Sequence, residues 1–201
     1  VYTRNGIPSP RKGYYLSAPL VQDLDTLPYP DYDDFFYQLE KSRIKLPERL
    51  SIPIQTSRGC WWGEKMGCTF CAANGSVKKY RSKSDRRVLN ELIYLLDRYP
   101  FPLIMMIDNV LEMGYFKHLL PEIAERRLGA KLFCKVKSNL NKDQIRILRD
   151  AQFAVIQPGI ESLSSSILRI MRKGVDQLQN VQFLKWCKEF GIAPLWYLLW
   201  G

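Results

Sequence analysis

The sequence predicts an α/β protein whose parallel strands form a partial, TIM-like (β/α)6 barrel. From Ser51 onward, short apolar runs rich in β-branched residues alternate with longer amphipathic stretches, as is typical of strand and helix units on a parallel sheet. Helix-capping residues stand before some of these stretches and glycines follow others. With 201 residues and 46% hydrophobic content, the chain can form one main domain with its own core.

Five strands are expected after Ser51. Their apolar runs cover residues 52–57, 103–107, 131–137, 153–156 and 193–199. A sixth strand is expected after Gly201, so the barrel of this chain is truncated after its fifth strand.

Five helices are expected between and after these strands, at residues 84–98, 115–127, 142–150, 165–172 and 177–190. Ser84 and Asn141 suit the N-caps of the first and third helices, and Gly129 and Gly191 follow the ends of the second and fifth.

Residues 1–50 are rich in Pro and Tyr and show little periodicity. We expect them to form a lead-in or linker with one short helix at residues 32–41, ahead of a main domain over residues 51–201. Because the chain starts at Val1 and ends inside an apolar run, we expect it to be a fragment of a longer protein.

The formal net charge is +10. Such a charge attracts nucleic acid, acidic peptides or phosphorylated ligands, although a basic run is also common on a solvated surface. Charge alone does not choose among these partners. The basic residues are densest at Lys78, Lys79, Arg81, Lys83, Arg86 and Arg87.

Two classes of protein are disfavoured. No apolar stretch reaches the roughly 20 residues that a membrane-spanning helix needs, and no signal segment is apparent. The five cysteines, three of them crowded into residues 60–71, do not resemble a secreted disulfide framework. A reducing cytoplasm is the expected location, with no membrane partner.

Functional residues on a parallel sheet gather at the carboxyl ends of the strands. The candidates are therefore residues 58–74, Asp108 and Asn109, Ser138 and Asn139, residues 157–162, and the end of the last strand.

The loop after the first strand carries three thiols, Cys60, Cys68 and Cys71. Thiolates bind soft metals and iron-sulfur clusters. Three ligands leave one iron of a four-iron cluster open to bind another molecule, and Gly63 and Gly67 allow the loop to wrap closely.

Two other interpretations compete for these thiols. A structural zinc site needs four ligands, and the only histidine, His118, lies far along the chain in a predicted helix. Structural cysteines are more often buried singly, as we expect for Cys134 and Cys187.

These residues resemble the radical S-adenosylmethionine (SAM) superfamily, whose usual signature has three cysteines spaced three and then two residues apart. Cys68-Thr69-Phe70-Cys71 matches the second half, with its aromatic residue, while the first gap is seven residues instead of three.

A closer resemblance, over roughly residues 25–201, is to the branch that matures ribosomal peptides (RiPPs) and includes cobalamin-dependent C-methyltransferases. It rests on Gly59-Cys60-Trp61-Trp62-Gly63, Ile107-Asp108-Asn109, Gln157-Pro158-Gly159-Ile160-Glu161-Ser162 and the segment 178–187.

The resemblance implies that Cys60, Cys68 and Cys71 bind a 4Fe-4S cluster whose open iron chelates SAM. One electron from the reduced cluster then cleaves SAM to methionine and a 5'-deoxyadenosyl radical. Cobalamin would be bound by a domain absent from this chain, with residues 1–50 as its exit linker.

The resemblance also suggests SAM contacts at Asp108 and Asn109, whose backbone carbonyls would receive the methionine amine, unless they only cap a turn. Gly159 permits close approach, and Glu161 and Ser162 would bind ribose or amine groups or else start the next helix. Lys137 shares a strand face with Lys135 and would bind a carboxylate or neutralise the cluster, unless both are surface lysines.

Aromatic residues near these positions have two interpretations. Trp61, Trp62 and Phe70 would shield the cluster from water. The aromatic residues of the last strand, Trp196, Tyr197 and Trp200, either line the cavity or only pack.

Three functions follow from the sequence. The first is a radical SAM enzyme that methylates or otherwise modifies a precursor peptide and takes electrons from a flavodoxin or ferredoxin. The second is a radical modifier of transfer RNA, which the net charge would suit. The third is a zinc-bearing nucleic-acid-binding module without catalysis.

Overall fold

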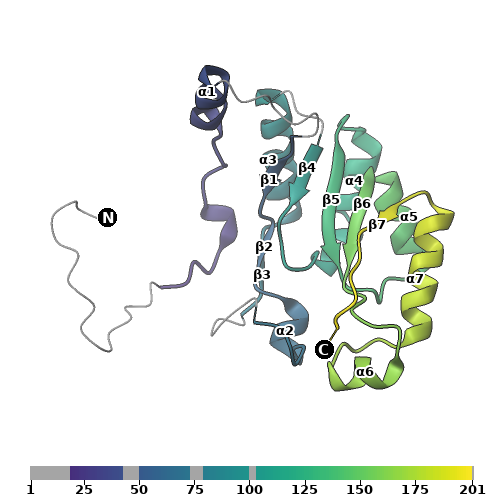
Figure 1. Ribbon diagram of the computed structural model, residues 1–201. Coiled ribbons are helices and arrows are strands. Elements are labelled where there is room, and N and C mark those ends of the chain that lie inside the picture. Colours follow the sequence, from purple (N-terminus) through teal and green to yellow (C-terminus); the bar gives the residue numbers. More distant parts are fainter. Residues whose placement is uncertain (1–18, 43–49, 73–78, 100–102, 201) are drawn as a thin grey trace, which may run out of the picture.

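The computed structural model describes residues 19–42, 50–72, 79–99 and 103–200, and Figure 1 shows an open sheet with helices packed against it. The five strands of the main sheet are parallel and pair in chain order, which is how successive strand-helix units wind into a barrel. The predicted α/β class is confirmed, and the barrel is not closed. The strands are β1 (Ile52–Ile54), β4 (Leu103–Met106), β5 (Lys131–Val136), β6 (Phe153–Pro158) and β7 (Ala193–Pro194).

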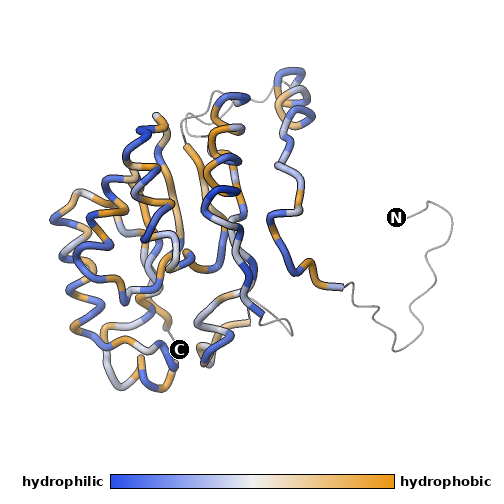
Figure 2. The backbone as a smooth tube through the Cα atoms, turned by 180° about the vertical axis from the view of Figure 1, so that it is seen from behind, coloured by the Kyte–Doolittle hydropathy of each residue, from blue (hydrophilic) through white to orange (hydrophobic). Residues whose placement is uncertain are grey.

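Four helices cover one face of the sheet. Figure 2, seen from behind, shows them in front of the hydrophobic strands. They are α3 (Asp85–Arg98), α4 (Leu119–Arg126), α5 (Lys142–Asp150) and α7 (Gln177–Glu189), and a shorter helix, α6 (Ser165–Ile170), lies beyond the carboxyl end of β6.

The hydrophobic core lies between the sheet and these helices. Burial alternates along β5, where Leu132, Cys134 and Val136 are buried, as the period of a strand requires. Cys187 of α7 enters the same core. The prediction that Cys134 and Cys187 are core residues is therefore confirmed.

Side-chain caps fix the helix starts as expected. The Ser84 hydroxyl accepts a hydrogen bond from the Arg87 backbone N–H at 3.2 Å, and Asn141 forms a reciprocal capping box with Gln144. Both predicted N-caps are confirmed.

Two predicted elements are each split in the structure. The strand expected at residues 52–57 ends at Ile54, and β2 (Ser57–Arg58) instead pairs with β3 (Arg81–Ser82) as a separate antiparallel ribbon. The helix expected at 115–127 becomes a 3-10 turn, η2 (Met113–Phe116), followed by α4. Pro121 has no N–H to bond Lys117, so one continuous α-helix cannot run through this point.

Two other elements are shorter than expected. The strand expected at 193–199 covers only Ala193–Pro194; the Leu195 N–H still donates to the Ile156 carbonyl, and beyond it Leu198 forms an isolated bridge with Glu161. The helix expected at 165–172 ends at Ile170, and Arg172 has a left-handed φ of 53° that stops any continuation.

The lead-in packs along α3. It contains a 3-10 turn, η1 (Leu24–Thr26), and α1 (Asp33–Lys41), which confirms the short helix expected at 32–41. The guanidinium of Arg87 lies 3.9 Å from the centre of the Tyr29 ring, and Arg98 forms an ion pair with Asp33.

Much of the basic run faces this lead-in rather than solvent. Arg81 and Arg87 donate hydrogen bonds to the backbone carbonyls of Val21 and Leu27. Lys83 is only 6% exposed and contacts Glu91 of α3 at 2.6 Å, and Arg87 approaches the same carboxylate at 3.4 Å. Arg81, Lys83 and Arg87 therefore hold parts of the fold together instead of presenting their charges to solvent.

Within the part of the chain that the structure describes, none of the helices is both long and apolar enough to cross a bilayer.

The Glu91 carboxylate should be among the most sensitive polar groups in the fold. Glu91→Ala leaves the buried Lys83 ammonium unpaired, so we expect the free energy of unfolding to fall by about 3–5 kcal/mol in urea titrations. Glu122→Ala on α4 is the matched control, because its pair with Arg126 is largely exposed and should contribute about 1 kcal/mol or less. Equal losses in the two variants would contradict this assignment.

Candidate active site

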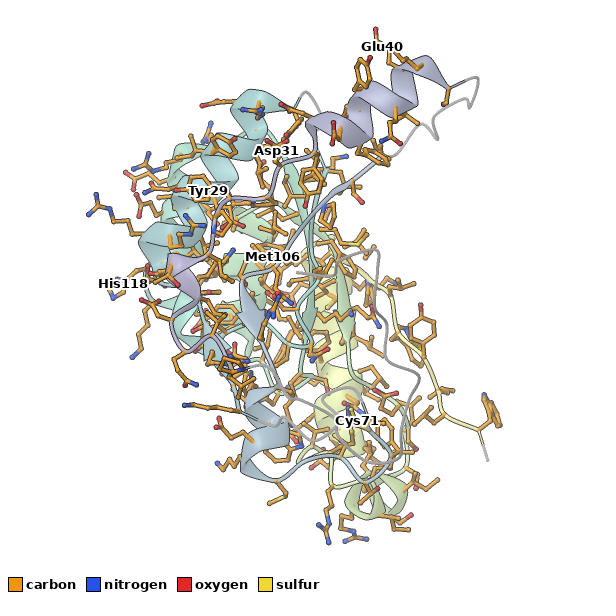
Figure 3. All side chains as sticks on the ribbon, turned by 90° about the vertical axis from the view of Figure 1, so that its left-hand side faces the viewer. Tyr29, Asp31, Glu40, Cys71, Met106 and His118 are labelled. Carbon is orange, nitrogen blue, oxygen red and sulfur yellow. The ribbon has the colours of Figure 1, made fainter. Side chains whose placement is uncertain are left out.

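A pocket of about 200 Å³ at the carboxyl ends of β5 and β6 contains all three predicted thiols. Figure 3 shows Cys71 at the end of the molecule opposite α1, the helix that carries Glu40. The lining residues are Cys60, Trp62, Cys68, Phe70, Cys71, Asn109, Val110, Lys135, Val136, Lys137, Gln157, Pro158, Gly159, Glu161, Lys173 and Tyr197.

The thiols share the pocket without converging on one point. Among the described residues, no group of three or more His, Cys, Asp or Glu side chains is close enough to hold a single metal ion. The three thiols thus line one pocket without forming a ready single-ion site.

The cysteine loop includes a short helix that the sequence did not suggest, α2 (Trp61–Lys65). Cys60 is its N-cap, and the Cys60 sulfur accepts a hydrogen bond from the Gly63 N–H at 3.4 Å. Gly59 just before it has a φ of 86°, and a Cβ there would lie 2.5 Å from the Lys79 carbonyl oxygen. A glycine is therefore required where the loop leaves β2.

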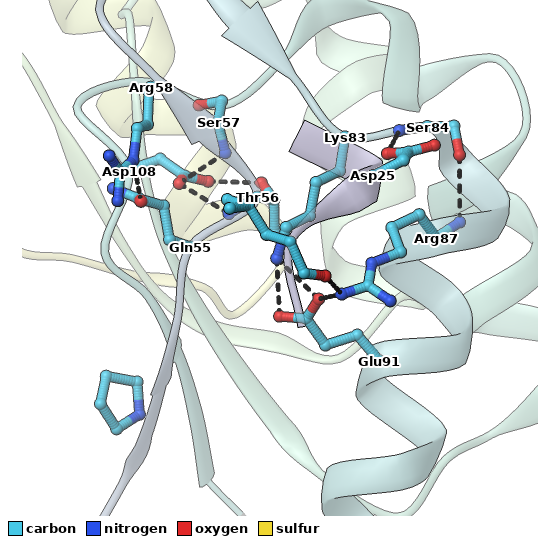
Figure 4. A network of polar contacts seen from close by, with 12 residues as sticks. Asp25, Gln55, Thr56, Ser57, Arg58, Lys83, Ser84, Arg87, Glu91 and Asp108 are labelled. Atoms are coloured by element: carbon cyan, nitrogen blue, oxygen red, sulfur yellow. Dashed lines mark hydrogen bonds and ion pairs between the residues drawn. The ribbon is translucent and has the colours of Figure 1, made fainter. Parts of the chain in front are cut away.

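Asp108 fixes the start of this loop instead of facing the pocket. Its carboxylate, 2% exposed, accepts hydrogen bonds from the backbone N–H groups of Thr56 and Ser57, both at 2.8 Å, and from the Thr56 hydroxyl. Figure 4 shows these bonds beside the Lys83–Glu91–Arg87 cluster. Burial raises the pKa of Asp108, and the hydrogen bonds from Thr56 and Ser57 oppose that shift.

Asn109 is the residue of this pair that lines the pocket. Its side-chain amide donates to the Gly59 carbonyl at 3.2 Å, which ties the end of β4 to the cysteine loop.

The cysteine loop contacts the segment between α6 and α7 at two points, Trp62 and Thr69. The Trp62 indole N–H donates to the Arg172 carbonyl at 3.0 Å, and the Thr69 N–H donates to the Met171 carbonyl at 3.1 Å. Gly174 has a φ of 62°, and a Cβ there would lie 2.3 Å from the Trp62 ring. These contacts thus join the loop after the first strand to the α6–α7 segment.

Lys137 is confined beneath this contact and is 7% exposed. Its ammonium donates to the Gly174 carbonyl at 3.2 Å and lies 4.4 Å from the centre of the Trp62 ring. Burial lowers the pKa of Lys137 to about 8, and the nearby charge of Lys173 acts in the same direction. Lys135, which shares its strand face, also lines the pocket.

Lys173 is a pocket residue that sequence reasoning missed. It is 6% exposed, and its ammonium lies 3.4 Å from the Glu161 carboxylate. No sequence signal marked it; in the structure a Cβ at Gly159 would lie only 2.8 Å from the Lys173 nitrogen. Burial raises the pKa of the Cys68 thiol, and the charge of Lys173 counteracts that rise.

Ser162 shapes the loop after β6 and does not line the pocket. Its hydroxyl accepts a hydrogen bond from the Ser164 N–H at 3.1 Å, and its carbonyl accepts one from the Asn180 side chain at 3.0 Å. Asn180, another residue missed from sequence, is fully buried and also accepts a 2.6 Å hydrogen bond from the Ser138 hydroxyl. Gly159 and Glu161, in contrast, do line the pocket.

Comparisons with known proteins identify the family of this chain. The profile of the Radical SAM superfamily matches residues 54–201. An uncharacterized methyltransferase of Pyrococcus horikoshii is 26% identical over 181 residues, which are 88% of this chain and 38% of that protein.

Two solved structures share the fold. The cobalamin-dependent SAM radical enzyme OxsB aligns with a TM-score of 0.69 and 22% identity over 89% of this chain and 26% of its own. The radical SAM methyltransferase TsrM of Kitasatospora setae, solved with cobalamin and a [4Fe-4S] cluster, gives a TM-score of 0.65 and 19% identity over 75% of this chain and 31% of its own. The chain therefore spans well under half the length of each of these relatives.

The contact between Trp62 and Gly174 should resist any added side chain. Gly174→Ala must accept both a left-handed backbone and a clash with the indole, so we expect the free energy of unfolding to fall by about 2–4 kcal/mol. Gly191→Ala is the control, because Gly191 has a similar φ of 72° with nothing within 4 Å of the added Cβ, and its cost should be about 1–2 kcal/mol. Combining Gly174→Ala with Trp62→Leu should recover part of the difference, and strict additivity of the two losses would argue against the contact.

Proposed function

The chain belongs to the radical SAM superfamily, and from this premise we propose that it is an enzyme core that binds a 4Fe-4S cluster through Cys60, Cys68 and Cys71 and cleaves SAM reductively. The observation that carries the proposal is that these three thiols line one open pocket. The described lining of that pocket includes no histidine and no fourth cysteine. Three protein ligands would leave one iron open for SAM.

The pocket suits a cluster better than a single ion. A structural zinc ion needs four ligands on one point, whereas a cluster accepts thiolates spread around a larger body. Gly67, with a φ of 76°, lets the loop turn between Cys60 and Cys68. When bound, the cluster would supply the electron that breaks a carbon-sulfur bond of SAM and yields a 5'-deoxyadenosyl radical.

The surrounding residues would position SAM and exclude water. Trp62 and Phe70 line the pocket beside the thiols and would limit solvent access. Asn109, Lys137, Gly159 and Glu161 are the predicted SAM-binding residues that line it. We infer that Asp108 and Ser162 act indirectly, by fixing the backbones of the two loops.

We further propose that the intact protein is a methyltransferase that also uses cobalamin. The Pyrococcus horikoshii relative is named a methyltransferase, and both solved structures are of cobalamin-binding enzymes. For the substrate we propose a ribosomal peptide, which rests on the sequence motifs alone, and for the electron donor a flavodoxin or ferredoxin.

Transfer RNA is a weaker candidate substrate than the net charge suggested. Lys83 is buried against Glu91, and Arg81 and Arg87 bond to the lead-in backbone, so these cations are not free to bind phosphates.

Cluster assembly should depend on the three pocket thiols and not on the core cysteines. After anaerobic reconstitution, Cys68→Ala should lose most bound iron and sulfide, because a two-ligand site holds the cluster poorly. Cys134→Ala should keep them, since Cys134 is buried in the core. Electron paramagnetic resonance (EPR) of the reduced wild-type protein should change when SAM is added. Equal iron loss in both variants, or zinc in place of iron, would overturn the ligand assignment.

The peptide substrate can be tested in cells that lack the gene for the intact protein. Comparative mass spectrometry of peptide fractions should find one peptide lighter by a methylene unit per lost methyl group, and returning the wild-type gene, but not the Cys68→Ala form, should restore it. Loss of a methyl group from transfer RNA, with an unchanged peptide fraction, would favour the RNA alternative.

A further inference from the structure

Two buried lysines, Lys137 and Lys173, line the same pocket as the three thiols. They are 7% and 6% exposed, although lysine is rarely buried to this extent in proteins. Only Lys173 has a carboxylate partner among the described residues, Glu161 at 3.4 Å.

Both ammonium groups are held in place by the surrounding chain. Lys137 is fixed by the Gly174 carbonyl and the Trp62 ring. Lys173 lies between Glu161 and the Phe70 ring, whose centre is 5.8 Å away, in space that Gly159 leaves free. The side chains therefore cannot swing into solvent without breaking these contacts.

Both lysines share one pocket with Cys60, Cys68 and Cys71. A cluster bound by these thiols would therefore lie in the same space as the two ammonium groups. Charges in a partly buried pocket interact more strongly than the same charges in water.

A 4Fe-4S core bound by three thiolates carries a net negative charge, which grows when one electron is added. A fixed positive charge nearby stabilises the reduced form more than the oxidised form, and net charge is one of the factors that set the reduction potentials of these clusters. A fixed negative charge has the opposite effect.

Building on the proposed function, we propose that Lys173 raises the reduction potential of the cluster and that Glu161, through its ion pair, limits this effect. The step concerned transfers one electron from a low-potential donor to the cluster, with no bond made or broken. The positive charge of Lys173 would make reduction of the cluster by the donor easier, and the negative charge of Glu161 would make it harder.

The test measures the midpoint potential of the cluster in the intact protein, reconstituted anaerobically and without SAM, by titration with titanium(III) citrate followed by EPR. Leaving SAM out separates cluster tuning from any contact with its carboxylate. Lys173→Met should lower the midpoint, and Glu161→Gln should raise it. Lys131→Met is the matched control and should change nothing, because Lys131 is exposed at the opposite end of the strand that leads to Lys137.

A midpoint potential does not depend on the fraction of protein loaded, so partial cluster loss in Lys173→Met leaves the comparison valid. Lys173→Arg keeps the charge and should restore the wild-type midpoint. Unchanged midpoints, or shifts of the same sign in Lys173→Met and Glu161→Gln, would overturn this inference while the cluster assignment stands. A wild-type protein that assembles no cluster would overturn both.

Discussion

The arrangement of the site depends on the carboxylate of Asp108 at the end of β4. It accepts three hydrogen bonds from Thr56 and Ser57, where the chain turns away from β1. The cysteine loop starts two residues after Ser57. These three hydrogen bonds therefore fix the backbone from which Cys60 enters the pocket. The Thr56 carbonyl in turn accepts hydrogen bonds from the Lys83 N–H and the Tyr115 hydroxyl. The Asp108 hydrogen bonds are therefore connected to the ion pair between Lys83 and Glu91 of α3, and through α3 to the lead-in packed on that helix.

Sequence patterns predicted the parts of the fold that follow from periodicity and local chemistry. The order of strands and helices, the caps at Ser84 and Asn141 and the buried Cys134 and Cys187 all depend on residue type and spacing within a short window. The presence of the three thiols in one pocket also followed, because they share one loop after the first strand and such loops lie at the carboxyl edge of a parallel sheet.

What sequence could not predict depends on contacts between distant segments. Lys173 lies after a short helix and has no local pattern that marks it as a pocket residue, and only the three-dimensional approach of Glu161 and Gly159 gives it a role. Asp108 has the right position for a cofactor ligand, but its carboxylate is taken up by backbone N–H groups 51 and 52 residues earlier. The apolar pattern of residues 193–199 also predicted too long a strand, because after the bond from the Leu195 N–H to the Ile156 carbonyl the chain pairs again only at the bridge between Leu198 and Glu161.

The contact between Trp62 and the Arg172 carbonyl joins residues 110 positions apart in the chain. Contacts of such long range form late, because the entropy cost of closing the loop must be met before they stabilise anything. During synthesis the thiols leave the ribosome well before Lys173 and Gly174, so nascent chains carry an unshielded cysteine loop. The cysteine loop therefore gains the support of the Arg172 carbonyl and of Gly174 only after the α6–α7 segment has been made.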